Sequence, residues 1–401
     1  MRTFSLLVLC LMGLFFVACD DDDTRLGDWA KGSAFPGEPR NQAVCFVIGD
    51  YAYVGLGIGV NGAEYNNFYK FDRKKGTWLT DTVARFKGEP RHAAVAFVID
   101  GKAYVGLGYR VGKAYTETNE NKRFFYDFWE YDPEKNAWEE VANYPGHDNP
   151  LGDYVTNDGG GRRDAIAFSF PDDKYGYVGL GRGYNDMVYK EFYSFTPTGT
   201  GENGKKGTWK EVGVAYPGEG RYGATVFVVD GSAYICLGST SGSVAVENIK
   251  FTPDGKGGGT FEMMQALREK PDNRQDRDYD RIPRNYAVSF VSDAGKDGQA
   301  YGYVATGSGN SNLTVWRYDH TRDRWHQMED IVGGNVAGAV AFSVYNKLGT
   351  QQFGMYTTGG GGLDQVLNAN VTTDSWWFYP DIKEWRGNDY STTEVGRYRY
   401  E

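Results

Sequence analysis

The sequence has no excess of basic residues. Lysine and arginine number 43 against 53 aspartates and glutamates, which gives a formal net charge of −10. A protein that neutralises the phosphates of a nucleic acid needs clustered positive charge. We therefore exclude nucleic acid as a partner.

Cysteine is scarce, with 4 in 401 residues. Cys10 and Cys19 lie in or directly after an apolar N-terminal run, which leaves Cys45 and Cys236 for the rest of the chain. Both lie among Val, Ile and Phe, where a free cysteine behaves as a small buried hydrophobe. The chain contains six similar copies of one sequence pattern, and the two cysteines occur in the first and the fourth copy. If the copies close into a ring, these two lie on opposite sides, and their sulfur atoms are too far apart to bond. We predict two free thiols.

The N-terminus has the pattern of an export signal. Arg2 precedes the apolar run LLVLCLMGLFFVA, as in signal peptides. FVAC at 16–19 resembles the bacterial lipobox, and this resemblance implies a signal at 1–18 and a lipid on Cys19. An ordinary cleaved signal is the alternative. Aspartates 20–23 open an acidic tether at 19–28, similar to a surface-display signal of some Gram-negative bacteria. We expect an outer-membrane lipoprotein, exposed at the cell surface, that contacts the membrane only through its lipid.

Glycine and aromatic residues are abundant, with 55 glycines and 16% Phe, Trp and Tyr. Residues 90–108 read PRHAAVAFVIDGKAYVGLG, two apolar runs joined by the turn Asp100-Gly101, which is a β-hairpin signal. Similar stretches begin at Arg40, Arg162, Arg221, Arg284 and, more weakly, Val336. Strands that are apolar on both sides must be covered on both sides.

Each copy continues into an aromatic third strand and then a fourth strand that begins at a large aromatic residue. These residues are Trp78, Trp138, Trp209, Phe261, Trp325 and Trp385. Their spacing, about 50 to 70 residues, is typical of kelch units. The chain resembles a kelch β-propeller over residues 29–401, although most copies have Gly-Leu-Gly where kelch units have adjacent glycines. The resemblance implies an all-β fold with six blades, each of four antiparallel strands.

How the ring closes is left open by the sequence. GDWAKG at 27–32 and KEWRGN at 383–388 both offer a fourth strand to the sixth blade. We expect the N-terminal segment to pair within that blade. A ring of seven blades would need another pair of first and second strands, and we find none.

An arginine precedes the first strand in five copies. The positions are Arg40, Arg91, Arg162, Arg221 and Arg284. First strands line the channel of a propeller, so we expect these guanidinium groups to converge on its opening, where repulsion requires anions among them. Glu38, Glu89 and Glu219 would satisfy the nearest arginines. Alternatively, a ligand carboxylate or sulfate docks on Arg162 and Arg284, in an arrangement that kelch adaptors for acidic peptides resemble.

Three long connections, 109–125, 147–161 and 267–283, are expected on the same face. Long loops on a rigid scaffold are typical of recognition surfaces, although they can also be surface decoration. Tyr109, Tyr115, Tyr154 and Tyr184 would offer stacking platforms to sugars. With His92, Arg163 and the five arginines they form the predicted binding site for a protein partner or a glycan.

Catalytic patterns are mostly missing. Kelch-type copper oxidases need a Tyr–Cys cross-link and two His ligands. The histidines 92, 147, 320 and 326 and the two strand cysteines do not supply this set. We expect no metal and no cofactor.

One enzymatic alternative remains. AYVGLG, FYKFD at 68–72 and YPGEGR at 216–221 are similar to bacterial N-acetylneuraminate epimerases, which interconvert sialic acid anomers. This similarity implies Arg162 or Arg284 for the carboxylate and Glu89, Asp164 or His92 for proton transfer. We favour the binding module over this mutarotase.

Overall fold

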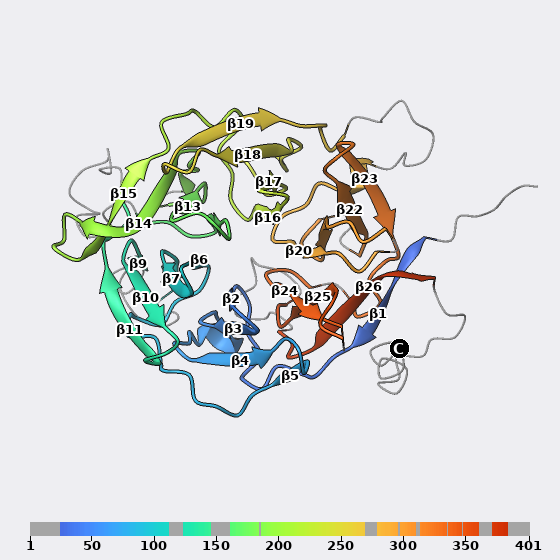
Figure 1. The fold of residues 1–401 in the computed structure, drawn as a ribbon, viewed down its shortest axis with the longest axis horizontal. Coiled ribbons are helices and arrows are strands. Elements are labelled where there is room, and N and C mark those ends of the chain that lie inside the picture. Colours follow the sequence, from blue (N-terminus) through green and yellow to red (C-terminus); the bar gives the residue numbers. More distant parts are fainter. Residues whose placement is uncertain are drawn as a thin grey trace, which may run out of the picture.

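The chain forms six four-stranded sheets arranged around a central axis (Figure 1). The structure is a computed structural model. It describes residues 25–111, 123–145, 161–183, 186–268, 279–295, 297–309, 313–334, 336–346, 348–360 and 371–383. The prediction of a six-bladed, all-β propeller with antiparallel four-stranded blades is confirmed.

The first three blades follow the chain from the first strand, nearest the axis, to the fourth strand at the outside. Blade 1 contains β2 (Val44–Ile48), β3 (Tyr51–Gly55), β4 (Phe68–Asp72) and β5 (Thr77–Trp78). Blade 2 contains β6 (Val95–Ile99), β7 (Lys102–Gly106), β10 (Phe128–Asp132) and β11 (Ala137–Val141). Blade 3 contains β12 (Ile166–Ser169), β13 (Gly176–Gly179), β14 (Phe192–Thr200) and β15 (Lys206–Glu211).

The next two blades repeat this order. Blade 4 contains β16 (Thr225–Val229), β17 (Ser232–Cys236), β18 (Ile249–Pro253) and β19 (Gly259–Met263). Blade 5 contains β20 (Val288–Ser292), β21 (Tyr301–Ala305), β22 (Val315–Asp319) and β23 (Arg324–Met328). In each, consecutive strands pair antiparallel.

Blade 6 combines the two ends of the fold. It contains β24 (Val340–Tyr345), β25 (Gln352–Thr357), β26 (Ser375–Lys383) and, as its outer strand, β1 (Leu26–Lys31). Trp29 lies opposite Phe378 in this pairing, and Figure 1 shows β1 in blue beside β26 in red. The N-terminal segment therefore completes the sixth blade, as expected, with a strand that begins three residues before position 29. Trp385 lies outside the described residues.

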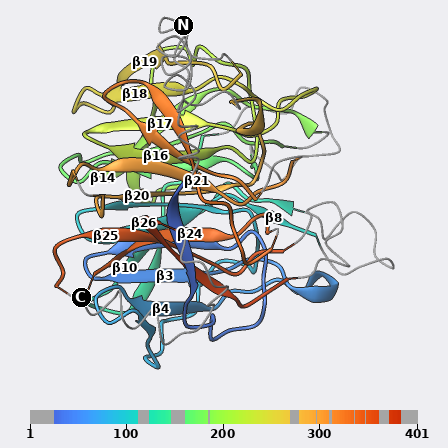
Figure 2. The ribbon, with the colours of Figure 1, turned by 90° about the vertical axis from the view of Figure 1, so that its right-hand side faces the viewer.

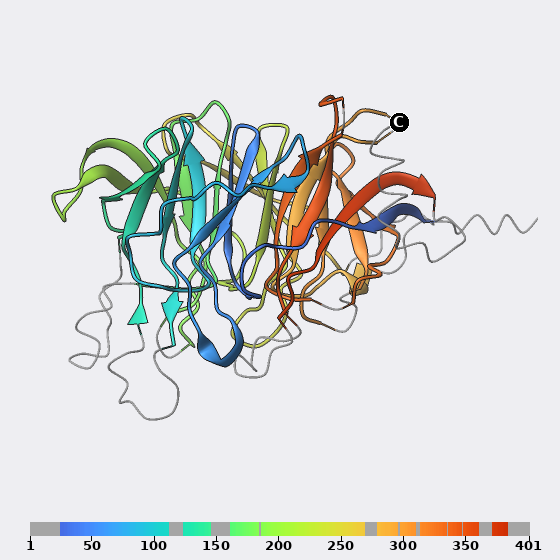
Figure 3. The same cartoon turned by 90° about the horizontal axis from the view of Figure 1, so that it is seen from below.

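One face of the ring carries several irregular additions. The short 3-10 helix η1 (Val60–Gly62) follows β3, and β8 (Tyr109–Arg110) pairs with β9 (Arg123–Phe124) after β7. Two views at right angles show η1 and the β8–β9 hairpin on the same side (Figures 2 and 3). We call this side the ring face. A second 3-10 helix, η4 (Tyr279–Arg281), precedes blade 5.

Large aromatic residues fill the wedges between blades. Trp138 is fully buried, with its ring centroid 4.9 Å from that of Tyr131 in its own blade and 5.2 Å from that of Phe68 in blade 1. Its indole Nε1 donates to the Ala84 carbonyl at 2.9 Å. Because the ring bridges two sheets and its polar atom is satisfied, it fixes the angle between neighbouring blades.

Backbone hydrogen bonds close the propeller at its axis. The amides of residues 42, 93, 164, 223, 286 and 338 each donate to the carbonyl of the equivalent residue in an adjacent blade, at 2.8 to 3.3 Å. All six residues have left-handed φ angles, from 50° at Gln42 to 63° at Gly338. The bonds form an unbroken cycle, which we call the axial ring.

The repeated glycines form a second cycle. Gly57, Gly108, Gly181, Gly238 and Gly307 each donate at 2.8 Å to the carbonyl of the arginine or Val336 in the next blade, and Gly359 donates at 2.9 Å to that of Arg40. A Cβ added at Gly108 would lie 2.7 Å from the His92 carbonyl oxygen, so a side chain would prevent this approach. Leucine is accommodated before it at a φ of 57°.

The two cysteines outside the N-terminal run are free thiols, as predicted. Cys45 is in blade 1 and Cys236 in blade 4. Burial raises the pKa of both thiols to about 12, so they are unreactive near neutral pH. Among the described residues, no helix has the length and apolar character needed to span a membrane.

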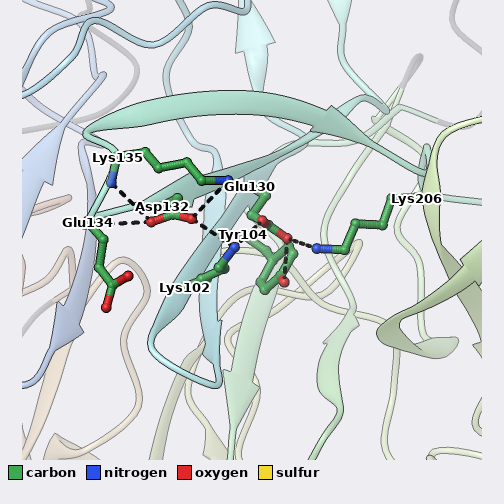
Figure 4. A network of polar contacts seen from close by, with 7 residues as sticks. All are labelled: Lys102, Tyr104, Glu130, Asp132, Glu134, Lys135 and Lys206. Carbon is green, nitrogen blue, oxygen red and sulfur yellow. Dashed lines mark hydrogen bonds and ion pairs between the residues drawn. The ribbon is translucent and has the colours of Figure 1, made fainter.

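A network of charged residues from β7 and β10 of blade 2 and β15 of blade 3 joins these two blades (Figure 4). Glu130 in β10 accepts hydrogen bonds from Lys102 at 2.9 Å, Tyr104 at 2.8 Å and Lys206 of blade 3 at 2.6 Å. Lys102 also pairs with Asp132 at 2.9 Å and holds the pKa of that carboxyl at about 2. Burial opposes ionisation of Glu130, but its three donors outweigh this and lower its pKa.

We predict that Glu130→Gln destabilises the propeller. The variant leaves Lys206 without its carboxylate partner and Lys102 with Asp132 alone. Because both lysines are partly exposed to solvent, the free energy of unfolding should fall by about 1 to 2 kcal/mol. Because the pKa of Glu130 is lowered by folding, its contribution is present above the ordinary glutamate pKa and is lost as the pH falls through the folded value.

Urea denaturation at pH 7 and at pH 3 measures this difference. Glu139→Gln is the matched control, since Glu139 is the exposed residue opposite Glu130 in β11, and it should have little effect. Equal stability of the two variants at pH 7 would show that the network contributes nothing.

Candidate functional site

The five repeated arginines are buried in the blades, with exposures of 0 to 1%. Each donates to the carbonyl of the residue directly after its second strand, such as Leu107 for Arg91 at 3.2 Å. Each also contacts the residue at the start of its third strand. These partners are Asn67 for Arg40, Asp127 for Arg91, Glu191 for Arg162, Glu247 for Arg221 and Thr314 for Arg284.

The prediction that Glu38, Glu89 and Glu219 pair with the nearest arginines is therefore mostly wrong. Only Glu38 pairs with its neighbour Arg40, at 3.2 Å. The side chain of Glu89 pairs with Arg110, and Arg221 pairs with Glu247. The carboxylates come from the third strand because each arginine extends along its blade and not toward the axis.

Arg162 and Arg284 also differ from expectation. Arg162 has a carboxylate partner, Glu191, at 2.6 Å. Arg284 bonds to carbonyls and to Thr314, and burial lowers its pKa to about 10. Since all five groups are enclosed and hydrogen-bonded, we base the candidate site on the residues that follow them.

Those residues form six isolated β-bridges, one in each blade, next to the axial ring. The pairs are Asn41–Ile58, His92–Tyr109, Arg163–Arg182, Tyr222–Ser239, Asn285–Ser308 and Ala337–Gly360. We call these twelve residues the bridge ring. The repeat places one pair per blade at the entrance of the first strand, so side chains from distant parts of the sequence surround the axis.

Three side chains of the axial ring block the channel. Gln42 Nε2 donates to Asp164 Oδ1 at 2.9 Å, and the Tyr286 hydroxyl donates to Asp164 Oδ2 at 3.1 Å. They come from blades 1, 3 and 5, so their contacts cross the axis. The even-numbered blades supply Ala93, Gly223 and Gly338, which leave room for the larger groups. We call Gln42, Asp164 and Tyr286 the axial plug.

Two arginines of blade 3 lie beside the plug. Arg182 Nε bonds to Asp164 Oδ2 at 2.9 Å and its guanidinium stacks 4.3 Å from the Tyr222 ring centroid. Arg163 lies 4.8 Å from the Tyr109 ring centroid, and its Nε is 3.7 Å from Asp164. That Nε is buried and has no hydrogen-bond partner among the described residues. The two cations thus share the buried carboxylate of Asp164, and Arg182 also lies 3.8 Å from the exposed Asp186.

His92 lies on the other side of Tyr109. The two rings are 5.6 Å apart, and His92 Nδ1 is 2.8 Å from Glu64 Oε1. Glu64 also accepts the amide of Val111 at 3.0 Å. His92 is fully buried, and its Nε2 has no hydrogen-bond partner in the described part of the chain.

Sequence reasoning identified some of these residues and missed others. His92, Arg163 and Tyr109 are brought together at the ring face, whereas Tyr115, Tyr154 and Tyr184 lie outside the described residues. Glu64, Arg182, Gln42 and Tyr286 were missed. Aligning the residue after each Gly-Leu-Gly could have found Arg182, but no local signal indicates that Glu64 reaches His92 in the next blade.

The six meandering blades, the glycine cycle and the aromatic wedges define the chain as a kelch-type β-propeller. No protein-family model matches it. The solved structure of YjhT is similar, with a TM-score of 0.59 and 15% identity over 86% of this chain and 95% of that one. At this identity the likeness shows the fold.

Curated proteins named N-acetylneuraminate epimerase match parts of the sequence. The protein of Pasteurella multocida is 26% identical over 234 residues, which are 55% of this chain and 58% of that protein. That of Yersinia enterocolitica is 33% identical over 95 residues, 24% of this chain and 22% of that protein. That of Escherichia coli K12 is 35% identical over 103 residues, 24% and 27% of the two. The chain thus spans less than two thirds of the length of each.

We predict that Arg91→Ala destabilises the fold. The change removes the charged donor of Asp127, which keeps only neutral donors such as Trp129 Nε1, and it removes the donor of the Leu107 carbonyl. It should lower the free energy of unfolding by about 3 to 5 kcal/mol. Arg163→Ala, which removes no direct hydrogen bond described here, should cost less than about 1 kcal/mol. Thermal and urea denaturation compare the two, and equal effects would contradict the distinction between them.

Proposed function

We propose that the bridge ring binds a small acidic sugar, free or at the end of a glycan, from the ring face. Three polar atoms of the ring support this: His92 Nε2, Arg163 Nε and Asn285 Oδ1 are buried without a hydrogen-bond partner among the described residues. Buried polar atoms are nearly always bonded to protein, water or a ligand. A sugar supplies several donors and acceptors within a small volume.

The charge of the site favours an acid. Arg163 and Arg182 share the buried carboxylate of Asp164, and Arg182 also lies 3.8 Å from the exposed Asp186. Asp164 already accepts from Gln42 and Tyr286, and the Nε of Arg163 has no hydrogen-bond partner among the described residues. A ligand carboxylate would neutralise the second cation, and charge-assisted bonds to guanidinium are strong where water is excluded. The axial plug would stop the ligand at the ring face.

A protein partner on the same face is supported less well. A protein would cover a broad surface. The three atoms without hydrogen-bond partners, His92 Nε2, Arg163 Nε and Asn285 Oδ1, all lie in the bridge ring, next to the axial ring. The name N-acetylneuraminate epimerase, carried by the relatives of this chain, also indicates a carboxylated sugar. Because these relatives match only part of the chain, their name supports an acidic sugar as the class of ligand and does not identify the ligand itself.

Mutarotation of N-acetylneuraminate is the second candidate function. It is favoured by the match to the Pasteurella multocida protein over 55% of this chain and by the buried His92–Glu64 pair in the ring. Ring opening of a free sugar needs only a positioned group for proton transfer, so the two functions would share one site.

We predict that Arg163→Ala weakens binding of N-acetylneuraminate by about tenfold or more, because a charge-assisted hydrogen bond contributes about 1.5 to 3 kcal/mol. Isothermal titration calorimetry of the folded variants measures the loss. Arg85→Ala is the matched control, since Arg85 is exposed on the link between blades 1 and 2. Unchanged affinity in Arg163→Ala, or no binding to the wild-type protein, would contradict the proposal.

We also propose that the protein is exported and anchored by a lipid on Cys19, because the apolar run, the FVAC motif and the acidic residues occur in that order. Cells fed a radiolabelled fatty acid should label the wild-type protein, and Cys19→Ala should lose both the label and membrane association. A Cys19→Ala protein that stays in the membrane fraction would contradict this anchor.

A further inference from the structure

We propose that His92 is the proton acceptor for the bound sugar and that Glu64 is its positioning residue. This inference rests on the proposed sugar site, to which it adds a proton-transfer role. Both residues belong to structure around the ring: His92 is in the bridge ring, and Glu64 pairs with Ile58 of the adjacent bridge.

The contact with Glu64 determines which imidazole nitrogen carries the proton. An ionised carboxylate can only accept a hydrogen bond, so Nδ1, 2.8 Å from Glu64 Oε1, is the protonated nitrogen of the neutral ring. The lone pair is then on Nε2. This is the arrangement in which a carboxylate orients a histidine as a general base.

Glu64 is itself held in place. Its Oε1 also accepts the Val111 amide at 3.0 Å, and its Oε2 lies 3.9 Å from Arg110 Nε. The side chain is 7% exposed. Arg110 in turn pairs with Glu89, so the histidine is fixed by a group that does not compete for its free nitrogen.

Nε2 is buried and without a hydrogen-bond partner among the described residues. Packing alone does not require a histidine at this place, because a buried nitrogen without a partner is unfavourable. Arg163 stacks on Tyr109, and Tyr109 also contacts His92. A sugar whose carboxylate engages Arg163 would therefore bring its anomeric centre near this part of the ring.

The step balances with water as the only co-reactant. Nε2 takes the proton of the anomeric hydroxyl, the bond between the anomeric carbon and the ring oxygen breaks, and the hydroxyl oxygen forms a carbonyl. The ring oxygen takes a proton from water. The hydroxyl formed from the ring oxygen then attacks the other face of the carbonyl and gives its proton to the hydroxide, which restores water. His92 returns its proton to the new anomeric oxygen.

The test measures binding and anomer exchange on the same proteins. NMR follows the conversion of pure α-N-acetylneuraminate, and calorimetry gives its affinity. His92→Asn should reduce the acceleration by about a hundredfold or more, a loss larger than any accompanying fall in affinity, because His92 also belongs to the proposed binding site. His326→Asn, in the outer strand β23 of blade 5, should behave as the wild type.

A second readout examines Glu64 directly. Long-range proton–nitrogen spectra, with His92 assigned by comparison with His92→Asn, should show a proton on Nδ1 and none on Nε2. Glu64→Gln should mix the two tautomers and reduce the acceleration, without preventing folding. A merely structural contact would leave the exchange rate unchanged in Glu64→Gln.

Each outcome decides the matter. Wild-type acceleration that survives in His92→Asn overturns the role of His92. Binding without any acceleration by the wild-type protein overturns the proton-transfer role but leaves the sugar site intact. Absence of binding removes the sugar site and this inference together.

Discussion

Closure of the backbone at the axis is the constraint on which the rest of the structure depends. Each blade donates one amide in the axial ring and one from a repeated glycine, and both cycles continue without a break from blade 6 to blade 1. A single four-stranded sheet cannot bury both of its faces. The cycles hold the blades at the distance where Trp138 and its equivalents fill the wedges, so backbone geometry and side-chain packing support each other.

The same constraint produces the candidate site. The side chains of left-handed residues such as Gln42 and Asp164 extend across the axis. The space there is too small for a large side chain from all six blades. The alternation of Gln42, Asp164 and Tyr286 with alanine and glycine resolves this crowding and seals the channel. The residues one position earlier, including the buried His92 and the partly buried Arg163, lie next to these side chains.

The sequence predicts the framework better than the site. Repeated features, such as the glycine after each second strand and Trp138 at the start of a fourth strand, report contacts that every blade makes, so repetition reveals them. The partner of each arginine is harder to predict, because Glu191 and Arg162 are separated by two whole strands. The contact of Glu64 with His92 occurs once and joins neighbouring blades, so no repeat signals it.

Blade 6 shows how closure and charge are linked. Val336 stands where the other blades have arginine, yet Asp374 still occupies the position before the third strand, where Asp127 and Glu191 bind their arginines. Asp374 instead pairs with Lys31 of β1 at 2.9 Å. Because β1 comes from the other end of the fold, this carboxylate meets its cation only when the ring is closed. In blade 6 this carboxylate therefore joins the two strands that complete the propeller through a partly exposed ion pair, where the other blades have a buried arginine.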